Sequence, residues 1–267
     1  MELFLLPFLA GIVPSILLPW VGSYLRLRDE WLATLGLAHL STAGALLAQF
    51  WHWPGFLGSW LLAMLGVAGK QLGGGKSNSA YALMLLTGWS LSLLLAANLA
   101  LGDALTQAMI DGQLYFSGTA ELLVNLGVFL VASVVLRWLG PNLLRERFFP
   151  GHARADRKPV WLWLILFDLL AASAIAAATA TLGLMASFGL VFVPAWIAFR
   201  LAGNWRQTIG LALAVGVLTY VSAFSLALAL DQPFGPLLTA VLLLVAFLAA
   251  IWGRFAQVKQ ASVSRLR

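Results

Sequence analysis

The chain has 267 residues, of which 61% are hydrophobic and only 10% are charged, so a soluble globular protein is excluded and an integral membrane protein is predicted. The formal net charge of +6 is typical of the basic cytoplasmic loops of such proteins, and we expect no nucleic-acid partner. Because the sequence contains no cysteine, disulfides and thiol chemistry are excluded.

Apolar stretches of roughly 20 residues recur along the whole chain, as membrane-crossing helices require, and the period-two alternation of a β-barrel is missing. We therefore predict an all-α polytopic bundle of eight or nine helices that forms one transmembrane domain over residues 1–267. We expect the first stretch to be retained, since it has no basic leader or cleavage site. The predicted stretches are Leu3–Leu25, Trp31–Phe50, Phe56–Leu72, Ala80–Leu101, Ala120–Trp138, Val160–Leu182, Leu184–Leu201, Thr208–Leu230 and Leu237–Trp252.

The uncertainty between eight and nine helices comes from residues 160–199, which are almost continuously apolar and have basic flanks on both sides. Both flanks must lie on the same side of the membrane, so this region crosses an even number of times. It is either two helices joined by a tight turn near Thr181–Gly183 or a partly re-entrant hairpin.

Lysine and arginine occur in alternate connections between the predicted helices. They lie at residues 26–28, 70–76, 137–158, 200–206 and 254–267, and the connections between these groups have none. The positive-inside rule then places the amino terminus outside and the carboxyl terminus in the cytoplasm. The longest basic connection, residues 140–159, is predicted to be a cytoplasmic loop. The sequence GGGKS at Gly73–Ser77 lacks the first glycine of a phosphate-binding loop, and we interpret it as a turn.

The stretch from Leu184 to Phe199 is an apolar helix that contains Pro194 and is followed by basic and polar residues. Proline removes a backbone hydrogen bond and kinks a helix, which a membrane helix tolerates where neighbouring protein satisfies the freed carbonyl. The residues after the proline, 195–206, are predicted to form a short amphipathic segment on an aqueous face. An ordinary kinked helix with a charged end is the alternative.

Two motifs carry a resemblance to a known family. The first, GLVFVPAWIAFRLAGNWRQ, has an apolar run with a glycine, then a proline, small residues and a basic end. The second, GSYLRLRDEWLATLGLAHLSTAGALLA, has a glycine, an arginine-bearing turn and an alanine-histidine pair followed five residues later by glycine. Together they resemble the permease subunits of ATP-binding-cassette (ABC) importers for zinc, manganese or iron. The matching positions are Gly22, Arg26, Arg28, Ala38, His39, Gly44, Gly189, Pro194, Ala195, Ala198, Arg200 and Arg206.

The resemblance implies a type II ABC importer permease in a bacterial inner membrane. It implies a homodimer that pairs with two cytoplasmic ATP-binding subunits and an extracytoplasmic solute-binding protein. The partners would hydrolyse ATP, and this chain would bind no cofactor and catalyse no reaction. Residues 195–206 would be the coupling helix, with Pro194, Ala198, Arg200 and Arg206 as its coupling residues.

The resemblance also implies a transport path for a metal ion, and the sequence departs from the family pattern at one position of that path. His39 lies within the second predicted helix, where a polar side chain faces protein or a water-filled cavity. In the metal importers an aspartate commonly precedes this histidine by four residues, on the same helical face. Leu35 occupies that position here. Imidazole alone can coordinate zinc or nickel, and in a homodimer two copies of His39 could face each other, but the cargo is left open.

Asp168 lies well inside the sixth predicted helix, and an intramembrane carboxylate must be paired, protonated or hydrated. It is either part of the transport path or a polar staple between helices. The alternative function for the whole chain is a proton-coupled secondary transporter in which Asp168 and His39 carry the proton. An intramembrane enzyme is disfavoured, because the sequence has no HExxH motif and no nucleophile beside a base.

Overall fold

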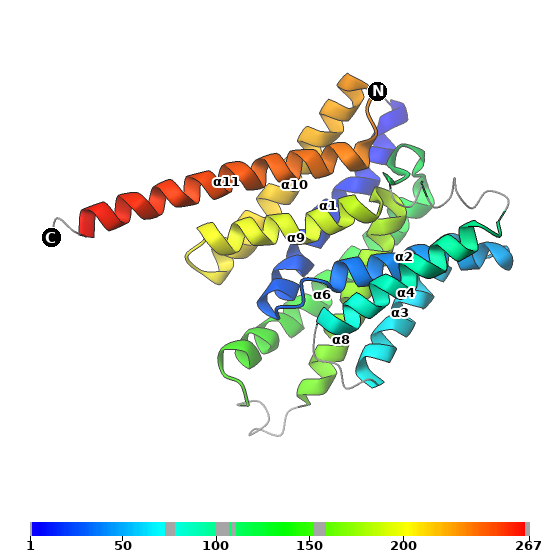
Figure 1. Cartoon of the computed structure of the whole chain (residues 1–267), viewed down its shortest axis with the longest axis horizontal. Helices are drawn as coiled ribbons and strands as arrows, with labels where there is room; N and C mark the ends of the chain where they lie inside the picture. The colour runs from blue at the N-terminus through cyan, green and yellow to red at the C-terminus, as the bar shows by residue number, and fades with distance from the viewer. Residues whose placement is uncertain (1, 73–77, 100–106, 108–110, 152–158, 265–267) are drawn as a thin grey trace.

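The computed structural model describes residues 2–72, 78–99, 107, 111–151 and 159–264, and within these ranges it contains helices and turns but no β-strand (Figure 1). The prediction of an all-α polytopic bundle is therefore confirmed. The α-helices are α1 (Glu2–Leu27), α2 (Ala33–Phe50), α3 (Gly55–Leu72), α4 (Asn78–Ala96), α6 (Thr119–Phe148), α8 (Val160–Leu182), α9 (Leu184–Leu201), α10 (Trp205–Leu230) and α11 (Phe234–Ser264), and a 3-10 helix, η1 (Leu114–Phe116), precedes α6.

The described part of the chain thus has nine α-helices of at least 18 residues, the larger of the two predicted numbers. Seven of them are long and apolar enough to cross a membrane, and α2 and α3 are not among these seven. Polar residues of α2 and α3, among them His39, Gln49 and Lys70, lower the hydropathy of these two helices. α2 tolerates this because most of it is buried against α3, α4, α8 and α9.

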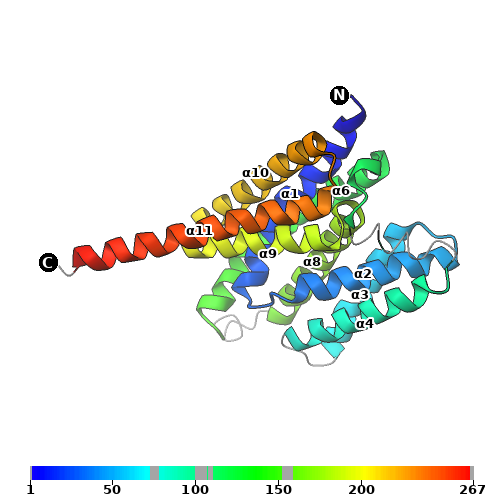
Figure 2. The same ribbon diagram turned by 45° about the horizontal axis from the view of Figure 1, so that its top comes forward.

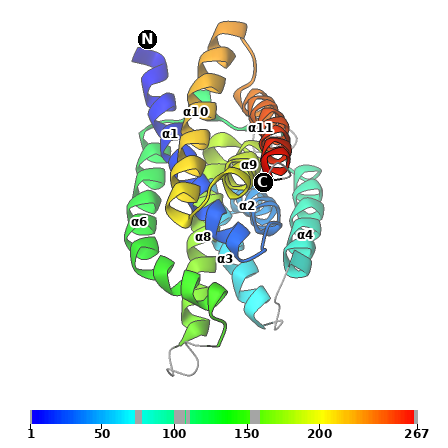
Figure 3. The same ribbon diagram turned by 90° about the vertical axis from the view of Figure 1, so that its left-hand side faces the viewer.

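The helices form a bundle around α1 and α8. α1 packs against α6, α9 and α10, and α8 packs against α3 and α6. α2, α3 and α4 lie together on one side of the bundle, and α11 runs along α9 and α10 (Figure 2). α4 and α6 lie on opposite flanks (Figure 3). This arrangement places α8 between the α2–α4 group and α6.

Glycine allows α2 to approach its neighbours closely. A Cβ atom added at Gly88 of α4 would lie 2.5 Å from the carbonyl carbon of His39, and one added at Gly58 of α3 would lie 2.7 Å from Cβ of Ala48. Such close backbone contacts are the usual way in which membrane helices associate. The backbone around His39 is therefore held firmly against α4.

The region from Val160 to Phe199 consists of two helices joined at Gly183. α8 ends at Leu182 and α9 begins at Leu184. Gly183 has a φ of +89°, in the left-handed region that a residue without Cβ adopts readily. Of the two alternatives that the sequence left open, the structure contains the two helices joined by a tight turn.

The predicted loop at residues 140–159 differs in its first part. α6 continues through Phe148, so residues 140–148 are helical. Leu136, Leu139 and Leu143 are all buried at helical spacing, so one face of α6 continues to pack on the bundle beyond the expected end. Residues 152–158 and the GGGKS stretch lie outside the described residues.

Candidate coupling and transport sites

The segment predicted as a coupling helix, residues 195–206, is composed of three pieces. It comprises the end of α9, a turn at residues 202–204 and the start of α10. The turn ends at Asn204, whose side-chain Oδ1 accepts a hydrogen bond from the backbone N–H of Gln207 at 2.9 Å. This contact caps α10, and the predicted segment is therefore a helix-turn-helix corner, with Pro194 inside α9.

The four predicted coupling residues differ in exposure. Arg200 and Arg206 are exposed, and Arg200 lies over the ring of Trp196 at 4.5 Å from its centroid. Ala198 and Pro194 are buried. Of these four residues, only the two arginines are therefore available to contact a partner in this conformation, and the alanine and proline lie in the helix behind them.

Aromatic contacts hold the corner against the end of α1. The rings of Trp205 and Tyr24 meet edge to face at 5.0 Å, and the guanidinium of Arg26 lies 5.7 Å from the centroid of Phe199. Both contacts join α1 to the ends of α9 and α10. A displacement of the corner would therefore be transmitted to α1.

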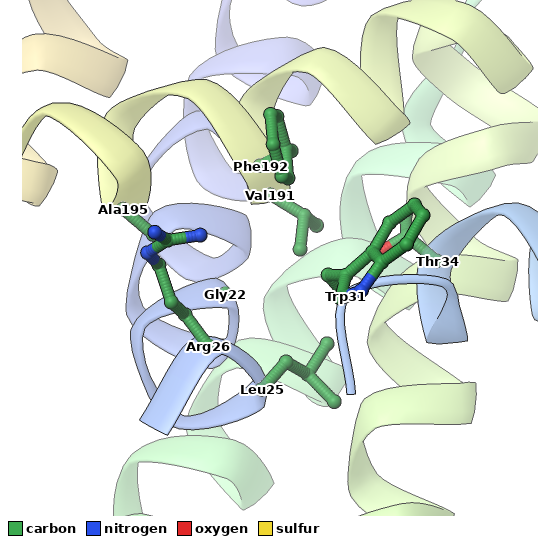
Figure 4. A pocket seen from close by; sticks show the side chains of 8 residues that line it. All are labelled: Gly22, Leu25, Arg26, Trp31, Thr34, Val191, Phe192 and Ala195. Carbon is green, nitrogen blue, oxygen red and sulfur yellow. The ribbon is translucent and has the colours of Figure 1, made fainter. Parts of the chain in front are cut away.

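The two motifs noted in the sequence meet beside this corner. Gly22 and Arg26 of α1, Thr34 of α2, and Val191 and Ala195 of α9 line one small pocket, which is shown in Figure 4. A Cβ at Gly22 would lie 2.8 Å from the carbonyl carbon of Val191, so this glycine permits the contact between α1 and α9. The cavity measures about 10 Å³, close to the least space that a water molecule requires.

Two residues that line the pocket have buried polar atoms without a hydrogen-bond partner in the described part of the chain. These atoms are Nε of Arg26 and Oγ1 of Thr34. Buried polar groups of this kind are commonly satisfied by a water molecule. The two sequence motifs thus meet at a closely packed contact that includes polar residues.

Asp168 of α8 lies in a buried cluster of charged residues. Its side chain is 0% exposed, with Oδ1 2.8 Å from Nη1 of Arg28 and Oδ2 2.8 Å from Nζ of Lys70. The Arg28 contact is an ion pair that lacks hydrogen-bond alignment, whereas Lys70 and Gln71 both donate hydrogen bonds to Oδ2. The carboxylate therefore joins α8 to α3 and to the residue after α1.

Glu30, in the turn between α1 and α2, completes the cluster. Its carboxylate pairs with Arg28 at 2.9 Å and with Lys70 at 3.1 Å. Tyr81 of α4 donates a hydrogen bond to Oε2 of Glu30 at 3.1 Å and accepts one from Lys70 at 2.8 Å. Two cations and two carboxylates thus balance, as buried charges require.

Arg28, a member of this cluster, is the residue directly after α1. Burial lowers the pKa of Arg28, but the nearby carboxylates of Asp168 and Glu30 outweigh this and raise the pKa above its ordinary value. The guanidinium therefore stays charged. The cluster ties α1, α3, α4 and α8 together at one end of the bundle.

His39 is half-buried on α2, and Leu35 is half-buried one turn earlier on the same face. Neither residue belongs to the charged cluster of Asp168. Among the residues that the structure describes, no three or more His, Cys, Asp or Glu side chains are grouped closely enough to hold a metal ion. A complete metal site around His39 would need donors from outside this set, and its role in the path stays a prediction.

Comparison with protein families decides the class of protein. The model of the ABC 3 transport family matches residues 1–253. The chain belongs to this family. The ABC 3 chain is therefore a transport permease that spans the membrane several times, and the resemblance predicted from the two motifs is confirmed. A comparison with curated protein sequences gives no match.

Solved structures share the fold of the ABC 3 chain. PsaBC from Streptococcus pneumoniae in complex with Fab is 17% identical, with a TM-score of 0.82, and the match covers 93% of this chain and 91% of that chain. An inward-facing metal-chelate type ABC transporter is 18% identical, with a TM-score of 0.71 and coverage of 92% and 85%. At these identities the matches establish the fold.

Sequence reasoning missed the partners of Asp168. Lys70 was interpreted only as a cytoplasmic charge, Arg28 was interpreted as a cytoplasmic charge and a motif position, and Glu30 and Tyr81 were not singled out. The available signal was Asp168 itself, because an intramembrane carboxylate predicts a nearby cation. The sequence offers several cations at the same end of the bundle, so it does not identify which of them pair.

Proposed function

We propose that the ABC 3 chain is the permease of an ABC importer for a divalent transition metal such as zinc or manganese. It acts as a homodimer with two ATP-binding subunits and receives cargo from an extracytoplasmic solute-binding protein. The family match over residues 1–253 carries the assignment as an ABC permease, and the shared fold with a metal-chelate type transporter is consistent with a cargo that contains a metal. The proposed location is a bacterial inner membrane, with the amino terminus outside and the carboxyl terminus in the cytoplasm.

The corner at residues 195–206 is the proposed contact with the ATP-binding subunit. Exposed Arg200 and Arg206 lie on either side of a capped turn, so they present two positive charges on a rigid support. Closure of the ATP-binding subunits moves the corner, and the aromatic contacts of Tyr24 and Trp205 pass this motion to α1. Alternating access follows from the movement of α1 and α9 relative to the other copy.

His39 is the proposed cargo ligand. Imidazole is a suitable ligand for zinc and related metals, and His39 and Leu35 are half-buried on one face of α2, which a second copy would have to approach. Two histidines from two chains give a weak, transient site that releases its ion. Weak binding suits transport, because a tightly held ion would not leave.

In this proposal Asp168 joins neighbouring helices through polar contacts beside the transport path. Both of its oxygens already contact cations, so neither oxygen is free to bind a transported ion. The charged cluster instead fixes α3 and α8 relative to the turn between α1 and α2. This arrangement gives no support to the proton-coupled alternative.

Proteoliposomes test the proposal. The purified chain is reconstituted alone and together with an ATP-binding subunit, and uptake of zinc or manganese is measured with ATP, with ATP plus vanadate, and with a protonophore. Uptake should need the ATP-binding subunit and ATP, and vanadate should stop it. If the chain alone takes up the metal and a protonophore abolishes this uptake, the protein is instead a secondary transporter.

A further inference from the structure

A groove runs along the outside of the bundle between α3 and α6, with α8 as its floor. It contains two cavities of about 360 Å³ and 410 Å³, and Val124 of α6 lines both. α8 packs against both flanking helices, so the groove follows the length of the bundle. Neither His39 nor Asp168 lines it.

The smaller cavity is an apolar channel. Leu123 and Val131 are strongly exposed on α6, and an added Cβ at Gly127, between them, would meet no atom within 4 Å. On the other side Trp60 of α3 donates a hydrogen bond to Oγ of Ser173 at 3.1 Å, which satisfies its indole N–H within the channel wall. This surface suits a hydrocarbon chain.

The larger cavity ends in polar groups. Glu121, Gln49 and Gln113 line it together with Asn125, whose amide nitrogen donates hydrogen bonds to Thr181 Oγ1 and the backbone oxygen of Glu121. No lysine or arginine occurs among its lining residues or in the sequence between Lys76 and Arg137. Glu121 thus presents a carboxylate to a site without a basic residue, which favours a cationic group.

The length of the groove matches one leaflet of a bilayer. From Glu121 to Val131 an α-helix rises by about 15 Å, which is half of the roughly 30 Å hydrocarbon core. A ligand that fills the groove has a cationic, hydrogen-bonding end and an apolar chain about one leaflet long.

We propose that this groove binds one membrane phospholipid with a primary ammonium head group, of the phosphatidylethanolamine class. The ammonium contacts Glu121 and the neighbouring amide oxygens, and one acyl chain lies past Gly127 toward Val131. A primary ammonium donates up to three hydrogen bonds, whereas the trimethylammonium of phosphatidylcholine donates none. The site needs only the membrane location of the chain, and it is independent of the cargo and of the coupling proposal.

Native mass spectrometry of the detergent-purified full chain tests this site with dioleoyl phosphatidylethanolamine and dioleoyl phosphatidylcholine. We expect the wild type to prefer the ethanolamine lipid by about fivefold, the contribution of a single favourable ion pair. Glu121→Gln should abolish the preference, because it removes the negative charge. The glutamine keeps an oxygen that can accept the hydrogen bond from the backbone N–H of Gly118, which Glu121 accepts at 2.8 Å.

Gly127→Leu tests the channel. The added side chain should fill the space beside Val131 and reduce retention of both lipids by about fivefold or more. Gly210→Leu is the matched control, since Gly210 is exposed on α10 outside the groove and also has open space around its Cβ. It should bind lipid as the wild type does. Thermal melting of each variant checks that it is folded.

Three results would overturn the proposal. The wild type could bind both lipids equally, or folded Gly127→Leu could retain them as well as Gly210→Leu does. Alternatively, Gly127→Leu could dissociate a dimer while lipid retention stays unchanged, which would assign this face to a second copy of the chain.

Discussion

Nζ of Lys70 lies 2.8 Å from Oδ2 of Asp168, and both side chains are almost completely buried. The two residues are on α3 and α8, 98 positions apart in the sequence. Isolated charges at such a place would be very costly, and pairing removes most of that cost. The pair therefore specifies how α3 sits on α8.

Asp168→Asn should destabilise the protein by about 3–5 kcal/mol, because Arg28 and Lys70 would then share only the carboxylate of Glu30. Thermal melting in detergent measures this change. The control is Asp29→Asn, which removes the ion pair between Asp29 and Arg147. The side chain of Asp29 is 72% exposed, so this change should lower stability by less than about 1 kcal/mol. Equal melting temperatures for the two variants would contradict a structural role for the cluster.

Gly88→Ala should lower stability by about 1–3 kcal/mol, because the new Cβ would lie 2.5 Å from the carbonyl carbon of His39 and overpack the contact between α2 and α4. Gly210→Ala is the comparison, since its Cβ meets open space. That change should be neutral or stabilise the helix by up to about 1 kcal/mol. Melting curves of both variants decide the matter, and a stable Gly88→Ala protein would show that the contact is loose.

His39→Ala should reduce metal uptake by about tenfold or more, the size of effect typical of altered metal sites. The protein should still fold, because this side chain is only half-buried. Metal content of cells that express the variant measures the effect. His52→Ala, at an exposed histidine in the turn after α2, is the control and should transport normally. Unchanged uptake with His39→Ala would remove His39 from the path.

Leu35→Asp should strengthen binding of zinc by about tenfold, because it adds a carboxylate one helical turn before His39. The new charge should also lower stability by up to about 3 kcal/mol. Isothermal titration with zinc in detergent compares the variant with Leu35→Asn, which is polar but uncharged. If both variants bind zinc as the wild type does, this face of α2 does not hold the metal.

Arg200→Glu should weaken the contact with the ATP-binding subunit by roughly 2 kcal/mol, as the loss of a central arginine does in other interfaces. Membrane insertion should not change, because Arg200 is exposed, and loss of its contact with the ring of Trp196 should lower stability by no more than about 1 kcal/mol. The measurements are co-purification of the ATP-binding subunit and ATP-driven uptake. Arg145→Glu, an exposed charge reversal on α6, should leave both intact. A normally coupled Arg200→Glu protein would rule out this corner as the contact.

The sequence alone determined the membrane class, the helices and the family. Apolar runs must match the thickness of the hydrocarbon layer, so the helices are recognisable without a structure. The basic flanks of the one long run indicated an even number of crossings, and the structure decided in favour of two helices joined at Gly183. The motif positions Gly22 and Gly44 were noted as a pattern. Their physical reason, the close approach of α1 to α9 and of α2 to α3, became visible only in the packed bundle.

The tertiary structure decided which residues meet. Hydropathy shows that Asp168 needs a partner, but Arg26, Arg28 and Lys70 all lie at the same end of the bundle, and the choice depends on how the helices are rotated and packed. The same holds for residues 195–206, where local capping by Asn204 divides one predicted helix into two. Periodicity along a chain records which faces are apolar, and only contacts between helices fix which of those faces touch.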